Sequence, residues 1–273
     1  MNRRAVAAIV RKDLMVVVRS KAVLLPLIIV PLLFLVLLPA MAALAPKLAT
    51  LPGSSLAGMS TFIEQMPAGL RQTIEGLDES QTLVLLMIVY FMAPMYLILP
   101  LMVASVIAAD SFAGEKERKT LEALLYTPTT DRELFLGKWL SAWLPALGVS
   151  LGGFFVYTLV ANLSAWPVMG RVFFPNAMWL VLVLWVAPAV AALGLGVTAL
   201  VSARVRGFQE AYQLGGVVVL PLVALVIGQV TGVMYFSIGL VWVLGIAVWS
   251  IDALLLWLSL KIFRRAGLID RLG

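Results

Sequence analysis

The sequence predicts an all-α integral membrane protein with six transmembrane helices. Its 273 residues are 62% apolar and 12% charged, whereas soluble domains have about 25% charged residues. Six apolar runs are long enough for the roughly 20 residues that a membrane helix needs, and a membrane barrel would show alternating segments of about 10 residues instead. We expect one transmembrane domain over residues 1–273, with spans at residues 22–45, 83–109, 139–165, 177–203, 212–233 and 240–263.

Charge predicts the orientation of these spans. Six spans place both chain ends on one side of the membrane, and all but three of the 20 lysines and arginines fall on that side. Positive residues are retained in the cytoplasm, so we expect both termini to be cytoplasmic. The net charge of +6 therefore indicates orientation and does not favour nucleic acid as a partner.

The lack of two residue types limits the catalytic and metal-binding chemistry that the chain can perform. The chain has no histidine and no cysteine, which excludes histidine-based catalysis, histidine-containing zinc sites and disulfides. We predict no catalytic residue, no metal site and no bound cofactor. Residues 40–42 resemble a signal-peptidase site, but a basic helix precedes them and the apolar run exceeds the usual 7–15 residues. We therefore expect residues 22–45 to be retained as a span.

Residues 1–21 precede the first span and read as a helix lying on the inner membrane surface. Valines and isoleucines occupy one side, and a basic amphipathic helix of this kind beds in lipid headgroups, so membrane lipids are an expected partner. Asp13 projects from the apolar side, where it either meets another protein, the alternative we favour slightly, or snorkels to water. Four bases fall within roughly a quarter turn of the helix: Arg4, Arg11, Lys12 and Arg19.

The external loop, residues 46–81, begins with turn formers and then shows helical spacing. Met66, Leu70 and Ile74 recur at four-residue steps, the period of one face of a helix. We expect one or two short helices over the external mouth. They are candidates for an external gate, and a plain connecting helix is an equal alternative.

The charged stretch at residues 110–138 separates spans 2 and 3. Its acids and bases are nearly balanced, which suits docking of a protein better than binding of anionic lipid; an ordinary solvated loop is the alternative. We predict a short helix at residues 120–126, ended by Pro128. Thr130-Asp131-Arg132-Glu133 then resembles a capping box that opens the next helix. The basic loop at residues 202–210 is a candidate second docking point.

Asp252 is the only acid deep within a predicted span. A carboxylate at the centre of a membrane helix costs about 2.5–3.5 kcal/mol on insertion scales, so it normally faces a partner or a wet cavity. Two interpretations are equally open. Asp252 contacts a cation or a substrate on the transport path, or it forms a structural hydrogen bond to a neighbouring helix.

The string from Gly114 to Lys138 resembles the signature of type-2 ABC transporter permeases, which has the form GEKE-x-GTLE-LL-TP-x(4)-E-x(2)-GK. Lys119 replaces the usual glycine, and this replacement favours a longer helix. Arg11-Lys12-Asp13-Leu14, followed by Arg19-Ser20, is similar to the interfacial helix of the family. With the six spans, the resemblance extends over essentially the whole chain.

The resemblance implies that the helix after span 2 is a coupling helix, seated in a cleft of a separate cytoplasmic ATPase subunit. Carried over residue by residue, it assigns the ATPase contacts to Glu115, Lys116, Glu117, Arg118, Thr120, Leu121, Glu122, Leu124, Leu125, Thr127 and Pro128.

It also implies an assembly of two permeases, identical or different, with two ATPase subunits in a prokaryotic cytoplasmic membrane. No G-x-x-x-x-G-K-[ST] phosphate loop occurs in the chain, so we expect no enzyme activity, and ATP and Mg are expected in the partner subunit. The cargo would be a drug, lipid, peptide or ion. An ion-gradient-driven secondary transporter is the alternative, although such proteins usually carry several ionisable or broken-helix sites within the membrane.

Overall fold

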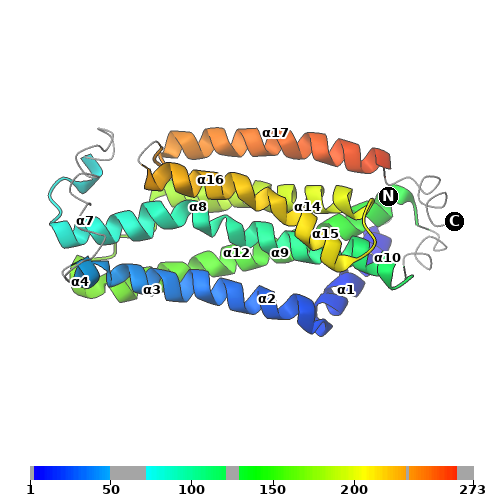
Figure 1. Ribbon diagram of the computed structural model, residues 1–273, viewed down its shortest axis with the longest axis horizontal. Helices are drawn as coiled ribbons and strands as arrows, with labels where there is room; N and C mark the ends of the chain where they lie inside the picture. Colours follow the sequence, from blue (N-terminus) through cyan, green and yellow to red (C-terminus); the bar gives the residue numbers. More distant parts are fainter. Residues whose placement is uncertain (1–2, 50–71, 121–128, 232–233, 263–273) are drawn as a thin grey trace.

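The computed structural model describes residues 3–49, 72–120, 129–231 and 234–262, and this part of the chain is helical with short connections. It forms an elongated bundle whose long helices run roughly along its long axis (Figure 1). Among the described residues, six helices are long and apolar enough to cross a membrane, which confirms the predicted fold class. These spans 1–6 are Val23–Ala43, Glu79–Glu117, Asp131–Met169, Ala177–Ser202, Phe208–Val230 and Ile238–Ser259.

Several spans are built from more than one helical segment. The first half of the chain contains α1 (Arg3–Arg19), α2 (Lys21–Leu32), a π-helical turn (Leu33–Leu37), α3 (Leu38–Ala43), α4 (Ala45–Ala49), α7 (Glu79–Leu85), a second π-helical segment (Leu86–Phe91), α8 (Met92–Tyr96), α9 (Ile98–Ala109), a third π-helical turn (Asp110–Gly114) and α10 (Glu115–Glu117). The second half contains α12 (Asp131–Met169), α13 (Ala177–Val181), a fourth π-helical turn (Leu182–Val186), α14 (Ala187–Ser202), α15 (Phe208–Gly215), a 3₁₀ turn (Gly216–Val218), α16 (Val219–Val230) and α17 (Ile238–Ile262).

Spans 2 and 4 form the centre of the bundle, and the other four surround them. The centre is tight because α9 and α14 come close together at Gly194. A Cβ atom added there would lie 2.9 Å from the carbonyl oxygen of Leu101 and 2.7 Å from Ser105 Oγ. Contacts that short are not tolerated in a close-packed interior, so the glycine sets the separation of these two helices.

Three consecutive carbonyls of span 2 receive side-chain donors from three other helices. Pro94 has no N–H to donate to the carbonyl of Tyr90, and Gln229 of α16 donates to that oxygen instead, at 3.1 Å. Tyr157 of α12 donates to Ile88 O and Trp179 of α13 to Val89 O, both at 2.7 Å. These bonds satisfy buried backbone groups in the irregular π-helical segment and fix span 2 among its neighbours.

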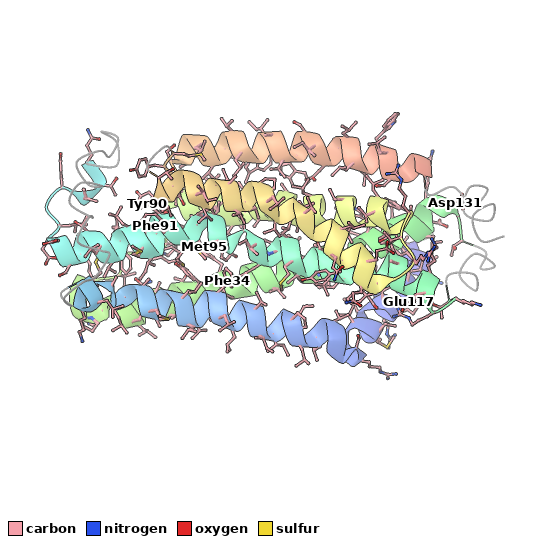
Figure 2. All side chains as sticks on the ribbon, viewed as in Figure 1. Phe34, Tyr90, Phe91, Met95, Glu117 and Asp131 are labelled. Carbon is pink, nitrogen blue, oxygen red and sulfur yellow. The ribbon has the colours of Figure 1, made fainter. Side chains whose placement is uncertain are left out.

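The two ends of the bundle differ in charge. One end, at the right in Figure 1, holds α1, α10 and the last turns of α17. We call it the basic end and define it by α1, by residues 115–120 and by the loop at residues 203–207. Glu117 and Asp131 lie at this end, whereas Phe34, Tyr90, Phe91 and Met95 lie toward the other end (Figure 2). α4 and the start of α7 form that other end.

Candidate coupling site at the basic end

A cluster of polar side chains, all of them buried except that of Lys12, links three segments at the basic end. We call it the polar joint. Its members are Lys12 and Asp13 of α1, Ser111 and Glu115 from the end of span 2, and Lys138 and Ser141 of α12.

Glu115 is the centre of the polar joint. Its carboxylate is bound by the amines of both Lys12 and Lys138, one on each oxygen. Glu115 is 5% exposed and Lys138 is 1% exposed. Lys138 also donates to the carbonyl oxygen of Ser111, at 2.6 Å. Buried charges are tolerated only when they are paired and hydrogen-bonded. Both Glu115 and Lys138 meet that requirement.

Asp13 is held within the same network. Its Oδ2 accepts from Ser111 Oγ at 2.8 Å and lies 3.0 Å from Ser141 Oγ, while Lys12 Nζ lies 2.9 Å from its Oδ1. The residue is 4% exposed. The sequence favoured another protein as the partner of Asp13, with snorkelling as the alternative. The structure corrects this: the partners belong to the same chain, because the helix face that carries Asp13 packs on α12.

Neighbouring carboxylates raise the pKa values of two bases that lie outside the spans. Burial lowers the pKa of Lys12, but hydrogen bonds to Glu115 and Asp13 outweigh it, and the pKa is raised above its ordinary value. The hydrogen bond from Arg118 to Asp110, at 2.9 Å, raises the pKa of that guanidinium in spite of its partial burial.

Gly137 lets α1 lie directly against α12. A Cβ atom at this position would lie 2.9 Å from Ile9 Cβ and 2.8 Å from its Cγ2. Val6, Ile9 and Val17 of α1 are buried, so part of the apolar face that the sequence assigned to lipid packs against protein. Arg4, Arg11 and Arg19 are exposed. A groove of about 740 Å³ runs between α1 and α12, with Arg3, Arg11 and Arg19 among its lining residues.

Lys116 and Glu117 hold the loop at residues 203–207. Lys116 Nζ donates to Val205 O at 3.1 Å, and the backbone N–H of Phe208 donates to Glu117 Oε2 at 2.9 Å. Gly207 is required for this contact because a Cβ atom there would lie 2.5 Å from Glu117 Oε2. The loop at residues 202–210, which the sequence named as a candidate second docking point, is thus joined to the end of span 2.

The backbone next to the joint differs in one respect from expectation. Lys119 was expected to lengthen the helix predicted at residues 120–126, of which only Thr120 is among the described residues. Lys119 itself is not helical, because α10 ends at Glu117 and Lys119 adopts a left-handed conformation with φ of 56°. The amide and hydroxyl of Thr120 then both donate to Glu115 O, at 3.0 and 3.3 Å. A lysine therefore occupies a backbone position that glycine adopts without steric cost.

The start of span 3 matches the prediction. Thr130 and Glu133 form the expected capping box, with the Glu133 N–H donating to Thr130 Oγ1 at 3.3 Å and the Thr130 N–H donating to Glu133 Oε2 at 3.0 Å. This cap fixes where α12 begins. It thereby sets the helical register that turns Gly137 toward α1 and Lys138 toward Glu115.

The remaining predicted site residues divide into two groups. Leu121, Glu122, Leu124, Leu125, Thr127 and Pro128 lie outside the described residues, as do Met66 and Leu70 of the external loop. Ile74 is half-buried and packs against the main core. Asp252 is buried, and within the described part of the chain neither of its oxygens has a hydrogen-bond partner. The structural hydrogen bond considered for it is therefore absent there.

Sequence reasoning missed Ser111 and Ser141 and did not name Lys138 as a site residue. Nothing in a single sequence marks two serines near the ends of apolar spans as partners of an aspartate about 100 or more positions away. Lys138 carried a signal, because it is the last residue of the motif string that also contains Glu115. Their direct pairing accounts for the presence of both residues in one motif.

Comparison with known proteins identifies the family. The family model described as "ABC-2 family transporter protein" matches residues 7–259. The ABC transporter permease protein NatB of Bacillus subtilis (strain 168) is 43% identical over 56 residues, which make up 20% of this chain and 14% of that protein. The short match is in accord with the family model, which covers nearly the whole chain. The chain therefore belongs to the ABC-2 family of transporter proteins and is a multi-pass membrane permease.

Proposed function

We propose that the chain is the translocation subunit of an ATP-driven exporter, coupled at its basic end to separate cytoplasmic ATPase subunits. Family membership supports a permease, and a permease without a phosphate loop of its own needs an ATP-hydrolysing partner. ATP and Mg would bind to that partner. Two permeases with two ATPase subunits form the proposed assembly, and the cargo would be a drug, lipid, peptide or ion.

The polar joint is the observation that carries this proposal. The residues on either side of segment 121–128, Glu115 before it and Lys138 after it, bind each other. Both are also connected to α1, through Lys12 and Asp13. A force applied to segment 121–128 therefore reaches α9, α12 and α1 together. That arrangement suits a lever that transmits closure of the ATPase to the spans.

In this proposal the signature motif has two roles. Its ends, Gly114–Glu117 and Gly137–Lys138, make contacts within the chain that position the segment. Its middle supplies the ATPase contacts, from Leu121, Glu122, Leu124, Leu125, Thr127 and Pro128, with Arg118 and Thr120 at the edge. Arg3, Arg11 and Arg19 line the apolar groove on α1, which suits contact with anionic lipid at the inner surface. Both termini would then be cytoplasmic.

The test measures ATP hydrolysis by an ATP-binding subunit in proteoliposomes, with and without the permease. We expect the permease to stimulate hydrolysis. Leu121→Asp and Glu122→Lys should remove the stimulation and the binding of the subunit, because each places a mismatched group in the proposed contact, while the variants still insert as wild type. Arg132→Ala, a change of an exposed residue of α12, should retain both. Stimulation that survives Leu121→Asp at its wild-type level would refute the assignment.

A further inference from the structure

A cavity of about 260 Å³ lies between α12, α14 and α17, in the half of the bundle next to the basic end. Asp252 and Ser259 of α17 line it together with Trp249 of the same helix. Trp139 of α12 lines another part of it, and the lining from α14 consists of two small residues, Ala192 and Gly196. Because Asp252 and Ser259 are seven positions apart, they fall on one face of α17, about two helical turns from each other.

Two polar side chains of this cavity, Asp252 and Ser259, lack hydrogen-bond partners within the described part of the chain. Asp252 is 8% exposed and Ser259 is 1% exposed. Neither the two carboxylate oxygens nor the serine hydroxyl makes a hydrogen bond within the described part of the chain. Buried polar groups are normally bonded, and an exception calls for an explanation. A group from outside the chain, seated in the cavity, would supply the missing partner.

The lining identifies the kind of ligand. A single carboxylate calls for a positive charge, and the faces of indole rings such as Trp139 and Trp249 attract cations. The described residues contain no group of three or more carboxylates that could enclose a metal ion, and hard cations such as Ca²⁺ take six to eight oxygen ligands. The rest of the lining is apolar, which suits an apolar body. We propose that this pocket binds an organic cation, a quaternary or protonated amine with an apolar substituent.

Binding of such a cation does not require an ATPase, so it is measured on the permease alone. That the cation is also cargo rests on the proposed function. A wild-type permease that binds the cation but does not stimulate ATP hydrolysis would count against the proposed function and leave the pocket assignment standing. A wild-type permease that stimulates ATP hydrolysis but does not bind the cation would count against the pocket assignment only.

The experiment is equilibrium binding of radiolabelled N-methyl-4-phenylpyridinium to the purified permease in lipid nanodiscs. We expect saturable binding by the wild type and a loss of affinity of about tenfold or more in Asp252→Asn. Uncharged 4-phenylpyridine should not compete for the site. Trp249→Leu should weaken binding about fivefold, whereas Trp257→Leu, at an exposed position of the same helix, should leave it unchanged.

Ser259→Ala has a matched control in Ser250→Ala. Ser250 is exposed on α17 and donates to Ile246 O, so its replacement should not change affinity, while Ser259→Ala should lower it about threefold. Thermal unfolding of each variant verifies that the protein is folded. Wild-type affinity in folded Asp252→Asn, or equal affinity for the charged and uncharged probes, would overturn the proposal, as would absence of saturable binding by the wild type.

Discussion

The polar joint and the Asp252 pocket both bury carboxylates in the same half of the molecule. They differ in the number of polar partners that surround each carboxylate. Asp13 and Glu115 are surrounded by two lysines and two serines. Asp252 has no such partner within the described residues. A buried charge that is fully paired contributes to one fixed arrangement, whereas an unpaired one lowers stability until something binds it. The first pattern fits a mechanical connection and the second fits a binding site.

The largest expected effect is that of Lys138→Ala. Removing this lysine leaves Glu115 buried with one partner fewer, and breaking a buried ion pair costs about 3–5 kcal/mol. Thermal unfolding in nanodiscs should show a large fall in the midpoint. Arg132→Ala, on the exposed side of the same helix, should change stability by less than about 0.5 kcal/mol. A midpoint for Lys138→Ala close to that of the wild type would mean that the joint contributes nothing to folding.

Replacing a serine by alanine should affect stability differently at the two sites. Ser111→Ala removes a donor to Asp13 and an acceptor for Lys138, and bonds to charged groups are worth about 1.5–3 kcal/mol. Ser259→Ala removes a hydroxyl that has no partner within the described residues, so the unliganded protein should unfold at or slightly above the wild-type midpoint. Equal losses in the two variants, measured by thermal unfolding, would erase the distinction between the sites.

The smallest effect is expected at the edge of the joint. Lys119 has a left-handed backbone, which costs an L-residue about 1–2 kcal/mol. Lys119→Gly should therefore stabilise the protein by up to about 1 kcal/mol, after the greater freedom of glycine in the unfolded chain is allowed for. Lys116→Gly is the matched control and should destabilise, because Lys116 is helical and donates to Val205. A lower midpoint for Lys119→Gly would show that the lysine side chain has a stabilising role.

The sequence was sufficient for the features that depend on local pattern. The six spans follow from the length of the apolar runs, and the capping box at Thr130 and Glu133 follows from the identity of four consecutive residues. The motif string also contained Glu115 and Lys138. The spans and the capping box depend on residues close in sequence, and the motif was found by its resemblance to the family signature, so a single sequence reveals all three.

The features that depend on how helices pack against each other could not be predicted from the sequence. Helical periodicity places Asp13 on the apolar side of α1, but it does not say that α12 covers that side; the close approach at Gly137 decides this. Likewise, composition singles out Asp252 as an acid within a span. Whether it finds a partner depends on the residues of α14 that face it, and Ala192 and Gly196 carry no polar side chain.

The comparison is tested most directly by making one substitution at both sites and measuring the thermal unfolding midpoint of the unliganded permease in nanodiscs. Asp13→Asn weakens the pairing with Lys12 and should lower stability by about 1–3 kcal/mol. Asp252→Asn removes a carboxylate that lacks partners in the described structure, and its midpoint should equal or exceed that of the wild type. A fall for Asp252→Asn as large as that for Asp13→Asn would contradict the account.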